Sequence, residues 1–467
     1  MNKEAIKAFY EANAAKRERW NRRNRFYHKS LERYFSLIIP AGKRVAELGC
    51  GSGDLLSAVK PSYGLGVDFS QAVIAIAERK YPHLHFKVAD AEAPDVSETF
   101  DYIIISDLLS ALWDAQKCIS QLRTLCSPST RVVISQYSYA WEPLIKLLQR
   151  LGLKQKQLTQ SWFSQEDVKS LLHLENFEVI VTHEKLLLPL YIPLANFIFN
   201  RLLANLPLVS KLNLLRIMVA RPVSGGSCEP SVSIVIPARN ERGNIENAIK
   251  RTPEFGSHRE FIFMEGRSSD GTYEEMLRVR DAYPEADIKV FRQRGKGKGN
   301  AVREAFDLAT GDVLMILDAD LTMPPEELPK FYDALRSGKG EFINGCRLVY
   351  PMEKHAMRFL NLLANKFFGW FFSFLLGQRL KDTLCGTKAL YRRDYENIKA
   401  SRSYFGDFDP FGDFDLLFGA AKQNLKIVDM IIRYKDREYG STQISRFRHG
   451  LLLIRMSLFA AKKMKFT

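Results

Sequence analysis

Two aspartates, Asp318 and Asp320, directly follow the apolar run Leu314–Leu317 and are separated by one residue. Successive side chains alternate along a strand, but the chain turns where the strand ends, so both carboxylates can face one site. Their hard oxygens suit Mg²⁺ or Mn²⁺, ions that bridge the phosphates of a nucleotide diphosphate and stabilise a departing phosphate. An Asp-x-Asp pair is frequent by chance, so its interpretation depends on the surrounding motifs.

Three more polar motifs stand where strand-like runs end or helical segments begin. Val235–Glu241 closes one apolar run, Glu265–Thr272 closes the next, and Lys296–Ala301 opens the helical segment before the aspartates. Open α/β sheets bind ligands at the carboxyl ends of their strands, where all four motifs are predicted to lie. The second half of the chain is therefore predicted to hold a ligand site at this edge.

The series from Ser231 to Leu321 resembles the family-two inverting glycosyltransferases, whose nucleotide-binding half has the A-type fold. The resemblance implies a nucleotide-sugar donor, with Asp318 and Asp320 as ligands of Mg²⁺ or Mn²⁺. It also implies a single displacement, in which the leaving nucleotide diphosphate is neutralised and the acceptor inverts the anomeric centre. The residues that it assigns to the donor are Pro237, Ala238, Asn240, Glu241, Glu265, Ser268, Asp270, Lys298, Asp318 and Asp320.

The C-terminal part resembles the polyprenyl-phosphate sugar transferases in three short elements. These are Gly345–Arg347, Asp382–Lys388 and Arg437–Ile444, with Cys385 where those enzymes have serine. A lysine and a glutamine replace an arginine and a lysine of the family, so one positive charge is lost. The acceptor-binding residues that the resemblance implies are Arg347, Asp382, Gly386, Lys388, Arg437, Thr442 and Gln443.

The acidic stretch that contains Asp413 and Asp415 aligns with the motif that supplies the general base in many family-two enzymes. A hydroxyl acceptor needs a base to take its proton, whereas a phosphate acceptor is already anionic. Asp413 is the preferred catalytic base and Asp415 the second choice. Capping of a helix by these carboxylates is the alternative, and both acceptor classes stay open.

The first half of the chain carries a glycine-rich motif, Glu47–Gly53, between a strand-like run and a helical segment. Glycines there allow a tight turn and a close approach of the backbone to a nucleotide-like ligand. Asp68 and Asp90 end the next two predicted strands, where a carboxylate can bind ribose hydroxyls or lie near a base. A dinucleotide-binding domain is the competing interpretation, but the acidic residue before the glycines favours S-adenosylmethionine over NAD.

The region from Lys43 to Ala220 resembles the class I S-adenosylmethionine-dependent methyltransferases. The resemblance implies that the glycines shape the methionine pocket and that Asp68 binds the ribose. It also places Asp107 at the reacting centre, either as a base for a hydroxyl acceptor or as a packing residue. No Asn-Pro-Pro-Tyr type sequence stands there, which argues against methylation of a nucleic-acid base amine. The residues implied in cofactor binding are Glu47, Gly49, Gly51, Gly53, Asp68, Asp90 and Ala91.

Alternating strand-like and helical patterns predict an α/β fold with two domains, a Rossmann-like class I sheet followed by an A-type domain. The Pro-, Gly- and Ser-rich stretch 222–230 is predicted to be a linker between domains at 41–221 and 231–467. The second domain would include acceptor and membrane-proximal helices. The predicted strands are Arg44–Glu47, Gly64–Val67, His85–Val88, Phe100–Ser106, Arg131–Gln136, Phe177–His183, Leu215–Ala220, Ser231–Pro237, Glu260–Glu265, Asp287–Arg292 and Asp312–Leu317.

The first forty residues are basic and aromatic, which is typical of a nucleic-acid-binding arm or of a solvated helix over a cofactor pocket. We favour a helical lid at residues 1–40. The net charge of +15 predicts an anionic partner, and nucleotide and lipid phosphates meet that requirement without nucleic acid.

Two apolar segments, Leu186–Ala204 and Phe359–Leu376, are interrupted by proline, asparagine or charged residues, so no membrane-spanning helix is predicted. Each is interpreted as a core helix in preference to a helix on a membrane surface. The six cysteines show no paired spacing and are interpreted as reduced thiols of a cytoplasmic protein, located at the inner face of the cell membrane if the acceptor is lipid-linked.

Two hypotheses for the whole chain follow from these motifs. The first is a bifunctional enzyme, a nucleotide-sugar-dependent glycosyltransferase for a polyprenyl-phosphate or other lipid-linked acceptor, fused to an S-adenosylmethionine-dependent methyltransferase. The second is a glycosyltransferase for a soluble hydroxyl acceptor, with a catalytically idle S-adenosylmethionine-binding module. The intact cofactor motifs favour the first.

Overall fold

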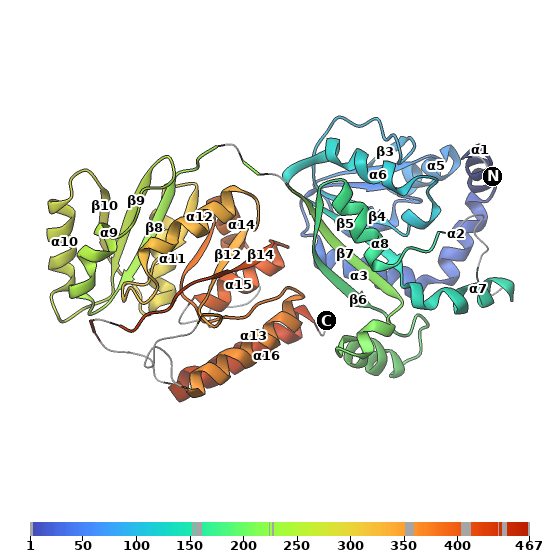
Figure 1. Cartoon of the computed structure of the whole chain (residues 1–467). Helices are drawn as coiled ribbons and strands as arrows, with labels where there is room; N and C mark the ends of the chain where they lie inside the picture. The colour runs from blue at the N-terminus through green and yellow to red at the C-terminus, as the bar shows by residue number, and fades with distance from the viewer. Residues whose placement is uncertain are drawn as a thin grey trace. The chain divides into compact units, whose positions relative to one another are not determined.

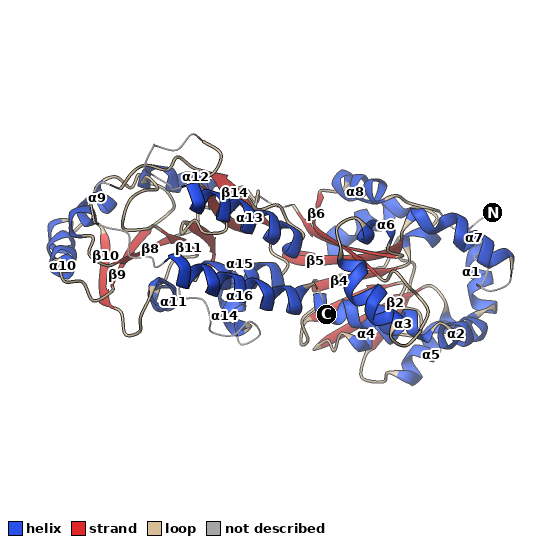
Figure 2. Cartoon of the chain, turned by 90° about the horizontal axis from the view of Figure 1, so that it is seen from below, coloured by secondary structure: helices blue, strands red, loops and turns tan. Residues whose placement is uncertain are grey.

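The computed structural model describes residues 3–151, 154, 161–223, 225–226, 228–350, 359–402, 412–437, 439–440 and 446–465. The chain forms two compact units, Met1–Val223 and Ser224–Lys465, each built around its own seven-stranded sheet (Figure 1). Helices cover the strands of each unit on both faces (Figure 2). The predicted α/β class is therefore confirmed in both halves.

The sheet of the N-terminal unit has the order β3-β2-β1-β4-β5-β7-β6, in which only β7 runs antiparallel to its neighbours. Its central strands are apolar along their length because helices bury both of their faces. The strands are β1 (Arg44–Leu48), β2 (Tyr63–Asp68), β3 (His85–Val88), β4 (Phe100–Ser106), β5 (Cys126–Tyr137), β6 (Phe177–Lys185) and β7 (Leu215–Pro222). The helices are α1 (Lys3–Ala12), α2 (Ala14–Arg23), α3 (Arg25–Ile38), α4 (Asp54–Ala58), α5 (Gln71–Lys80), α6 (Ala115–Gln121), α7 (Glu142–Arg150) and α8 (Gln165–Leu174).

The sheet of the C-terminal unit has the order β10-β9-β8-β11-β13-β12-β14, and β13 is its antiparallel strand. The strand order reverses between β8 and β11. Open α/β sheets bind ligands at such a topological switch point. The strands are β8 (Val232–Ala238), β9 (Arg259–Glu265), β10 (Asp287–Arg292), β11 (Val313–Ile316), β12 (Phe342–Cys346), β13 (Lys388–Tyr391) and β14 (Ile427–Ile431). The helices are α9 (Ile245–Lys250), α10 (Thr272–Ala282), α11 (Lys298–Leu308), α12 (Leu328–Arg336), α13 (Phe359–Leu376), α14 (Arg392–Ala400), α15 (Asp413–Lys422) and α16 (Arg446–Met464).

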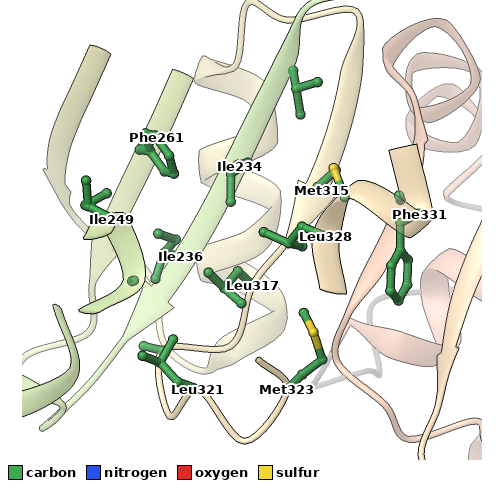
Figure 3. Close-up of a cluster of buried hydrophobic side chains, with 14 of the residues drawn as sticks. Ile234, Ile236, Ile249, Phe261, Met315, Leu317, Leu321, Met323, Leu328 and Phe331 are labelled. Carbon is green, nitrogen blue, oxygen red and sulfur yellow. The ribbon is translucent and has the colours of Figure 1, made fainter. Parts of the chain in front are cut away.

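A fully buried apolar cluster fixes the carboxyl ends of β8 and β11 (Figure 3). Ile236 of β8 and Leu317, just after β11, are each 0% exposed, and Leu328 and Phe331 of α12 lie in the same cluster. Burial of one such side chain stabilises the fold by about 1.5 to 3 kcal/mol. The cluster therefore holds in place the turn on which Asp318 stands, one residue beyond Leu317.

The core interpretation of Leu186–Ala204 is wrong. This segment belongs to an insertion between β6 and β7 that contains the short helical turns η4 (Phe197–Leu202), η5 (Leu203–Asn205) and η6 (Val209–Leu212). Its large apolar side chains are mostly exposed, because the described residues of its own unit do not cover them. Helix α13 is intermediate: Phe372 is buried, whereas Phe367 and Trp370 are more than half exposed. Among the described residues, no helix is long and apolar enough to cross a membrane.

Candidate functional sites

The loops that follow β8 and β9 are joined by hydrogen bonds at one edge of the second sheet. The backbone N–H of Asn240 donates to Ser268 Oγ over 3.0 Å, and that of Ser269 donates to Asn240 Oδ1 over 2.8 Å. Asn240 adopts a left-handed backbone with φ of 56°, which a short polar side chain tolerates. The Glu265 carboxylate accepts the N–H of Ser268. These predicted donor residues thus form one preorganised rim.

The remaining predicted donor residues of these loops lie on the same rim. Pro237 and Ala238 end β8, and the Ala238 carbonyl accepts the N–H of Gly266 over 2.9 Å. The Asp270 carboxylate accepts the N–H of Arg242 from the β8 loop and that of Thr272 at the start of α10. The backbone here is held by side chains from the opposite loop, so the rim has little freedom to change shape.

The two aspartates after β11 are accessible and each pairs with a cation. Asp318 Oδ1 lies 2.5 Å from Lys298 Nζ, and Asp320 Oδ2 lies 2.6 Å from Arg437 Nη2. The side chains of Asp318 and Asp320 are 27% and 17% exposed. Burial opposes ionisation of Asp318, but Lys298 at close range holds the pKa of its carboxyl below the ordinary value. Both carboxylates are therefore partly exposed and within reach of a ligand.

Gly386 lets Lys298 and Asp318 pack directly against the backbone, because it has no side chain. A Cβ placed on Gly386 would lie 2.0 Å from Lys298 Nζ and 2.2 Å from Asp318 Oδ2. No group of three or more acidic, histidine or cysteine side chains suited to a metal occurs among the described residues. Mg²⁺ is commonly held by one or two carboxylates and completes its shell with water and substrate phosphates. Asp318 and Asp320 therefore fit a divalent ion that binds together with a diphosphate.

Arg437 connects residues that the sequence placed in different motifs. Besides Asp320, its guanidinium donates from Nη1 to Glu241 Oε1 over 2.8 Å. Burial raises the pKa of Glu241 to about 7, with Arg437 opposing and Asp320 reinforcing that rise. Nearby, Tyr439 Oη donates to Asp270 over 3.3 Å. The sequence assigned Arg437 to the acceptor, and the structure places its side chain on two donor-site carboxylates.

The two candidate bases at the start of α15 have different surroundings. Asp413 Oδ1 lies 2.7 Å from the Nζ of Lys388, whose side chain is 0% exposed. Asp415 instead pairs with Arg402 at 3.0 Å and lies 3.8 Å from Arg303. Asp413 also faces Lys298, whose pKa it helps to raise, although burial of that lysine acts in the opposite direction. Of the two, Asp413 is the one that adjoins the Asp318 site.

The predicted acceptor residues are brought together in part. Arg347 grips Asp382 through two hydrogen bonds, of 2.7 Å from Nε and 2.9 Å from Nη2. Asp382 is 0% exposed, and Arg347 holds the pKa of its carboxyl low against the effect of burial. Gly386 instead lies against Lys298 and Asp318, and Lys388 pairs with Asp413. Thr442 and Gln443 lie outside the described residues.

In the N-terminal unit, the loop after β1 is shaped by glycines in the left-handed region. Gly49, Gly51 and Gly53 have φ values of 73°, 54° and 76°. A Cβ on Gly51 would meet nothing within 4 Å, so the loop leaves room above its backbone. The N–H of Gly51 donates to Asp68 Oδ2 over 3.1 Å, which orients that carboxylate toward the loop. The glycine loop and Asp68 therefore lie together at the ends of β1 and β2.

Glu47, before this loop, has a buried carboxyl oxygen without a hydrogen-bond partner among the described residues. The residue is 2% exposed, and the oxygen is Oε2. Burial raises the pKa of its carboxyl well above the ordinary value. A buried polar atom without a hydrogen-bond partner is costly unless a ligand pairs with it. A cationic amino group, such as that of a methionine moiety, fits this position.

Helix α1 lies over the ends of β2 and β3. Lys3 Nζ lies 2.5 Å from Asp90 Oδ2 and 2.6 Å from Glu92 Oε2. At the other end of the helix, Glu11 accepts the N–H groups of Gln71 and Ala72 at the start of α5. Ala91 is buried in the core below. The N-terminal residues thus contact the predicted adenine position directly.

Asp107, directly after β4, lines a small pocket together with Gln136, Tyr137 and Trp162. Its backbone has φ of 51°, and its Oδ2 accepts the hydroxyl of Tyr27 over 2.6 Å. Burial, reinforced by Asp107, raises the pKa of Tyr27 well above the ordinary value, so its hydroxyl stays protonated. Sequence reasoning had singled out the aromatic N-terminal stretch but not this contact.

A lysine that sequence reasoning missed also lies near this pocket. Lys154 Nζ stands 4.0 Å from the centroid of the Tyr137 ring, and burial lowers the pKa of its ammonium to about 8. A cation over an aromatic face is attracted by the ring quadrupole. Lys154 belongs to none of the sequence motifs, so its position near the pocket could not be expected from the sequence.

Comparison with protein families agrees with this division of the chain. Residues 19–182 match the family model of a methyltransferase domain, and residues 233–398 match that of glycosyl transferase family 2. The chain joins a methyltransferase domain to a family 2 glycosyltransferase domain. Both domains are of enzyme families, and each match covers the glycine loop or the Asp-x-Asp site described above.

Curated relatives match the glycosyltransferase domain. The chain is 37% identical over 138 residues to the dolichol-phosphate mannosyltransferase of Pyrococcus furiosus, across 29% of this chain and 38% of that protein. It is 29% identical over 222 residues to glycosyltransferase AglJ of Haloferax volcanii, across 47% of this chain and 68% of that protein. The chain thus spans well under half the length of the first relative.

Solved structures resemble each domain at low identity. Glucosyl-3-phosphoglycerate synthase from Mycobacterium tuberculosis, solved with Mn²⁺ and uridine diphosphate, is 17% identical, with a TM-score of 0.37, over 50% of this chain and 80% of that one. A possible histamine N-methyltransferase from Thermotoga maritima is 16% identical, with a TM-score of 0.37, over 46% of this chain and 99% of that one.

Proposed function

We propose that the glycosyltransferase domain transfers a hexosyl group from a nucleoside-diphosphate sugar to a lipid-linked acceptor, with polyprenyl phosphate as the first candidate. The observation that carries the proposal is the arrangement around Asp318, where the carboxylate and Lys298 form an ion pair packed against the backbone of Gly386. The name of the Pyrococcus relative, a dolichol-phosphate mannosyltransferase, supports the acceptor class.

In this proposal, Asp318 and Asp320 would hold Mg²⁺ or Mn²⁺, which supplies charge neutralisation for the diphosphate when bound. The rim formed by Asn240, Glu265 and Ser268 positions the nucleoside. Lys298 is placed to neutralise the departing diphosphate, because its ammonium already lies beside Asp318. A single displacement at the anomeric carbon then inverts its configuration, since one acceptor attacks opposite the leaving group.

The contacts of Asp413 bear on the choice of acceptor. Lys388 donates a hydrogen bond of 2.7 Å to Asp413 Oδ1, and a carboxylate can accept a proton from a hydroxyl. Such a base suits a lipid-linked glycan or a soluble sugar, whereas a polyprenyl phosphate needs no base. A soluble hydroxyl acceptor is therefore the second candidate, and Asp413 is the residue that favours it.

The apolar stripe of α13 supports a peripheral membrane position. Leu363, Phe367 and Trp370 recur at helical spacing and are 57%, 54% and 62% exposed. Helix α16 packs against α13 and exposes Leu458 and Lys462. An apolar face bordered by basic side chains is typical of a helix that lies in a membrane interface. This surface would bring a lipid-linked acceptor to the glycosyltransferase domain.

Hydrolysis of donor sugars without acceptor tests the proposal most directly. Purified protein is assayed against uridine and guanosine diphosphate sugars with Mn²⁺, beside the Asp320→Asn variant and the Asp333→Asn control on the exposed face of α12. We expect slow hydrolysis of at least one sugar, lost in Asp320→Asn and retained in the control. Absence of hydrolysis with every donor, or equal rates in both variants, would reject the proposal.

For the methyltransferase domain, we propose S-adenosylmethionine-dependent methyl transfer. The proposal is supported by Glu47 Oε2, which has no hydrogen-bond partner among the described residues, and by Asp68, which accepts the N–H of Gly51 in the glycine loop. An idle binding module is the alternative. Calorimetric titration of S-adenosylmethionine into the protein, into Asp68→Ala and into the exposed control Glu166→Ala measures occupancy. Tight binding that only Asp68→Ala weakens supports an intact cofactor site, and equally poor binding by all three favours a lapsed module.

A further inference from the structure

The insertion between β6 and β7 of the methyltransferase domain has an inverted polarity. Eleven large apolar side chains between Leu190 and Leu212 are at least 41% exposed, and Leu194 and Leu208 reach 76% and 82%. Over the same stretch Asn205 and Asn213 are 1% and 0% exposed. A water-facing segment shows the opposite distribution, because apolar contact with water is unfavourable.

Asparagine side chains satisfy backbone groups inside the insertion. Asn200 donates to the Leu188 carbonyl and accepts the Leu188 N–H, both over 2.8 Å. Asn213 donates to the Ala204 carbonyl over 2.8 Å, and Asn196 accepts the N–H of Ile192. Internal satisfaction of the backbone is what an environment without hydrogen-bonding partners requires. The insertion is thus a built structure whose outer face is apolar.

The charge of the insertion selects among the surfaces that could cover this face. Residues 186–214 contain no aspartate or glutamate, and their charged residues, Arg201 and Lys211, are both exposed. A second copy docked face to face would bring like charges together. A bilayer with anionic headgroups instead offers hydrocarbon for the leucines and phosphate for the two cations. Tyr191, at 69% exposure, suits the headgroup level.

We propose that this insertion is a monotopic docking element that holds the methyltransferase domain on an anionic phospholipid bilayer. It is separate from the stripe on α13 and does not depend on the proposed sugar acceptor. Within its own domain it touches helix α3, since the rings of Tyr191 and Phe26 lie 5.6 Å apart, and the next residue, Tyr27, bonds to Asp107 at the pocket. Docking would therefore keep the pocket close to the bilayer surface.

Flotation of the full chain with vesicles tests the proposal. The starting variant is Phe367→Asp/Trp370→Asp, which disables the stripe on α13, so that any remaining binding must come from elsewhere. Vesicles of phosphatidylcholine with phosphatidylglycerol are compared with vesicles of phosphatidylcholine alone. Leu194→Glu/Leu208→Glu is then added, and Leu174→Glu/Leu308→Glu serves as the matched control, because Leu174 and Leu308 are also exposed, at 63% and 42%.

We expect the starting variant to float with the anionic vesicles and more weakly with the neutral ones. Adding the insertion substitutions should reduce its partition by about tenfold or more, because two leucines lose their burial in hydrocarbon, and the control should not. Circular dichroism verifies that each variant is folded. Failure of the starting variant to float, or equal flotation after the insertion substitutions, overturns the proposal. So does a change of oligomer size in light scattering without a change in flotation, which would assign the face to a second copy.

Discussion

Arg437 donates a hydrogen bond of 2.6 Å to Asp320, a residue 117 positions earlier in the chain. This guanidinium therefore binds a carboxylate that is also a proposed ligand of the divalent ion. Its Nη1 donates a second hydrogen bond, to Glu241. Without ligands the site is therefore neutralised by its own side chains. A bound metal and diphosphate would exchange these internal ion pairs for new ones, with Arg437 released toward the phosphates.

The first prediction concerns metal binding. Asp320→Asn should weaken Mn²⁺ binding by at least roughly tenfold, because it removes an anionic ligand. Arg437→Ala should strengthen Mn²⁺ binding in the absence of donor, because it removes a competing cation. Titration calorimetry with MnCl₂ measures both, and Asp333→Asn is the control. Weaker Mn²⁺ binding by Arg437→Ala would contradict the competition between the cation and the metal.

The second prediction concerns the close packing of Lys298 and Asp318 against Gly386. In Gly386→Ala the new methyl group would overlap Lys298 Nζ and Asp318 Oδ2, so both must move. We expect donor hydrolysis to fall by roughly a hundredfold through misplacement of these groups, with little change in the melting temperature. Gly226→Ala, whose added Cβ would have its nearest neighbour 3.7 Å away, is the control. Full activity of Gly386→Ala would show that donor hydrolysis does not depend on the positions of Lys298 and Asp318.

The third prediction separates catalysis from stability at Asp413. Asp413→Asn leaves the buried Lys388 without its ion-pair partner and should lower the free energy of unfolding by about 3 to 5 kcal/mol. Asp413→Asn/Lys388→Met should recover much of that stability by removing both charges. If Asp413 is the base, transfer to a hydroxyl acceptor stays about 10² to 10⁴ times slower in both variants. Recovery of activity in the double variant would limit Asp413 to a structural role.

The fourth prediction concerns pH. Glu241 has a pKa of about 7 in the fold, mainly because it is buried, against 4.5 as the ordinary value. The fold thus favours the protonated form, and this stabilisation is complete below about pH 4.5 and is lost as the pH rises through about 7. Relative to Glu241→Gln, the wild type should lose melting temperature between pH 5 and pH 8 in calorimetry of the glycosyltransferase transition. A pH-independent difference between the two would refute the raised pKa.

Much of the fold was predictable because strand-forming runs and the polar motifs after them are local features. The strands His85–Val88 and Asp287–Arg292 occur at their predicted bounds. The fifth strand begins at Cys126 and not at Arg131, because its first residues pair irregularly with β4. The predicted linker at 222–230 contains the division of the chain between Val223 and Ser224.

The sequence by itself determined the two α/β units and the residues at their strand ends, since each depends on spacings of a few residues that fix backbone direction. Only the tertiary structure decided which charges meet. Arg437 reaches Asp320, Lys388 reaches Asp413 and Tyr27 reaches Asp107 because sheet order and helix packing bring distant segments together. It also decided that the leucines after β6 face outward, because exposure depends on what the rest of the fold leaves uncovered.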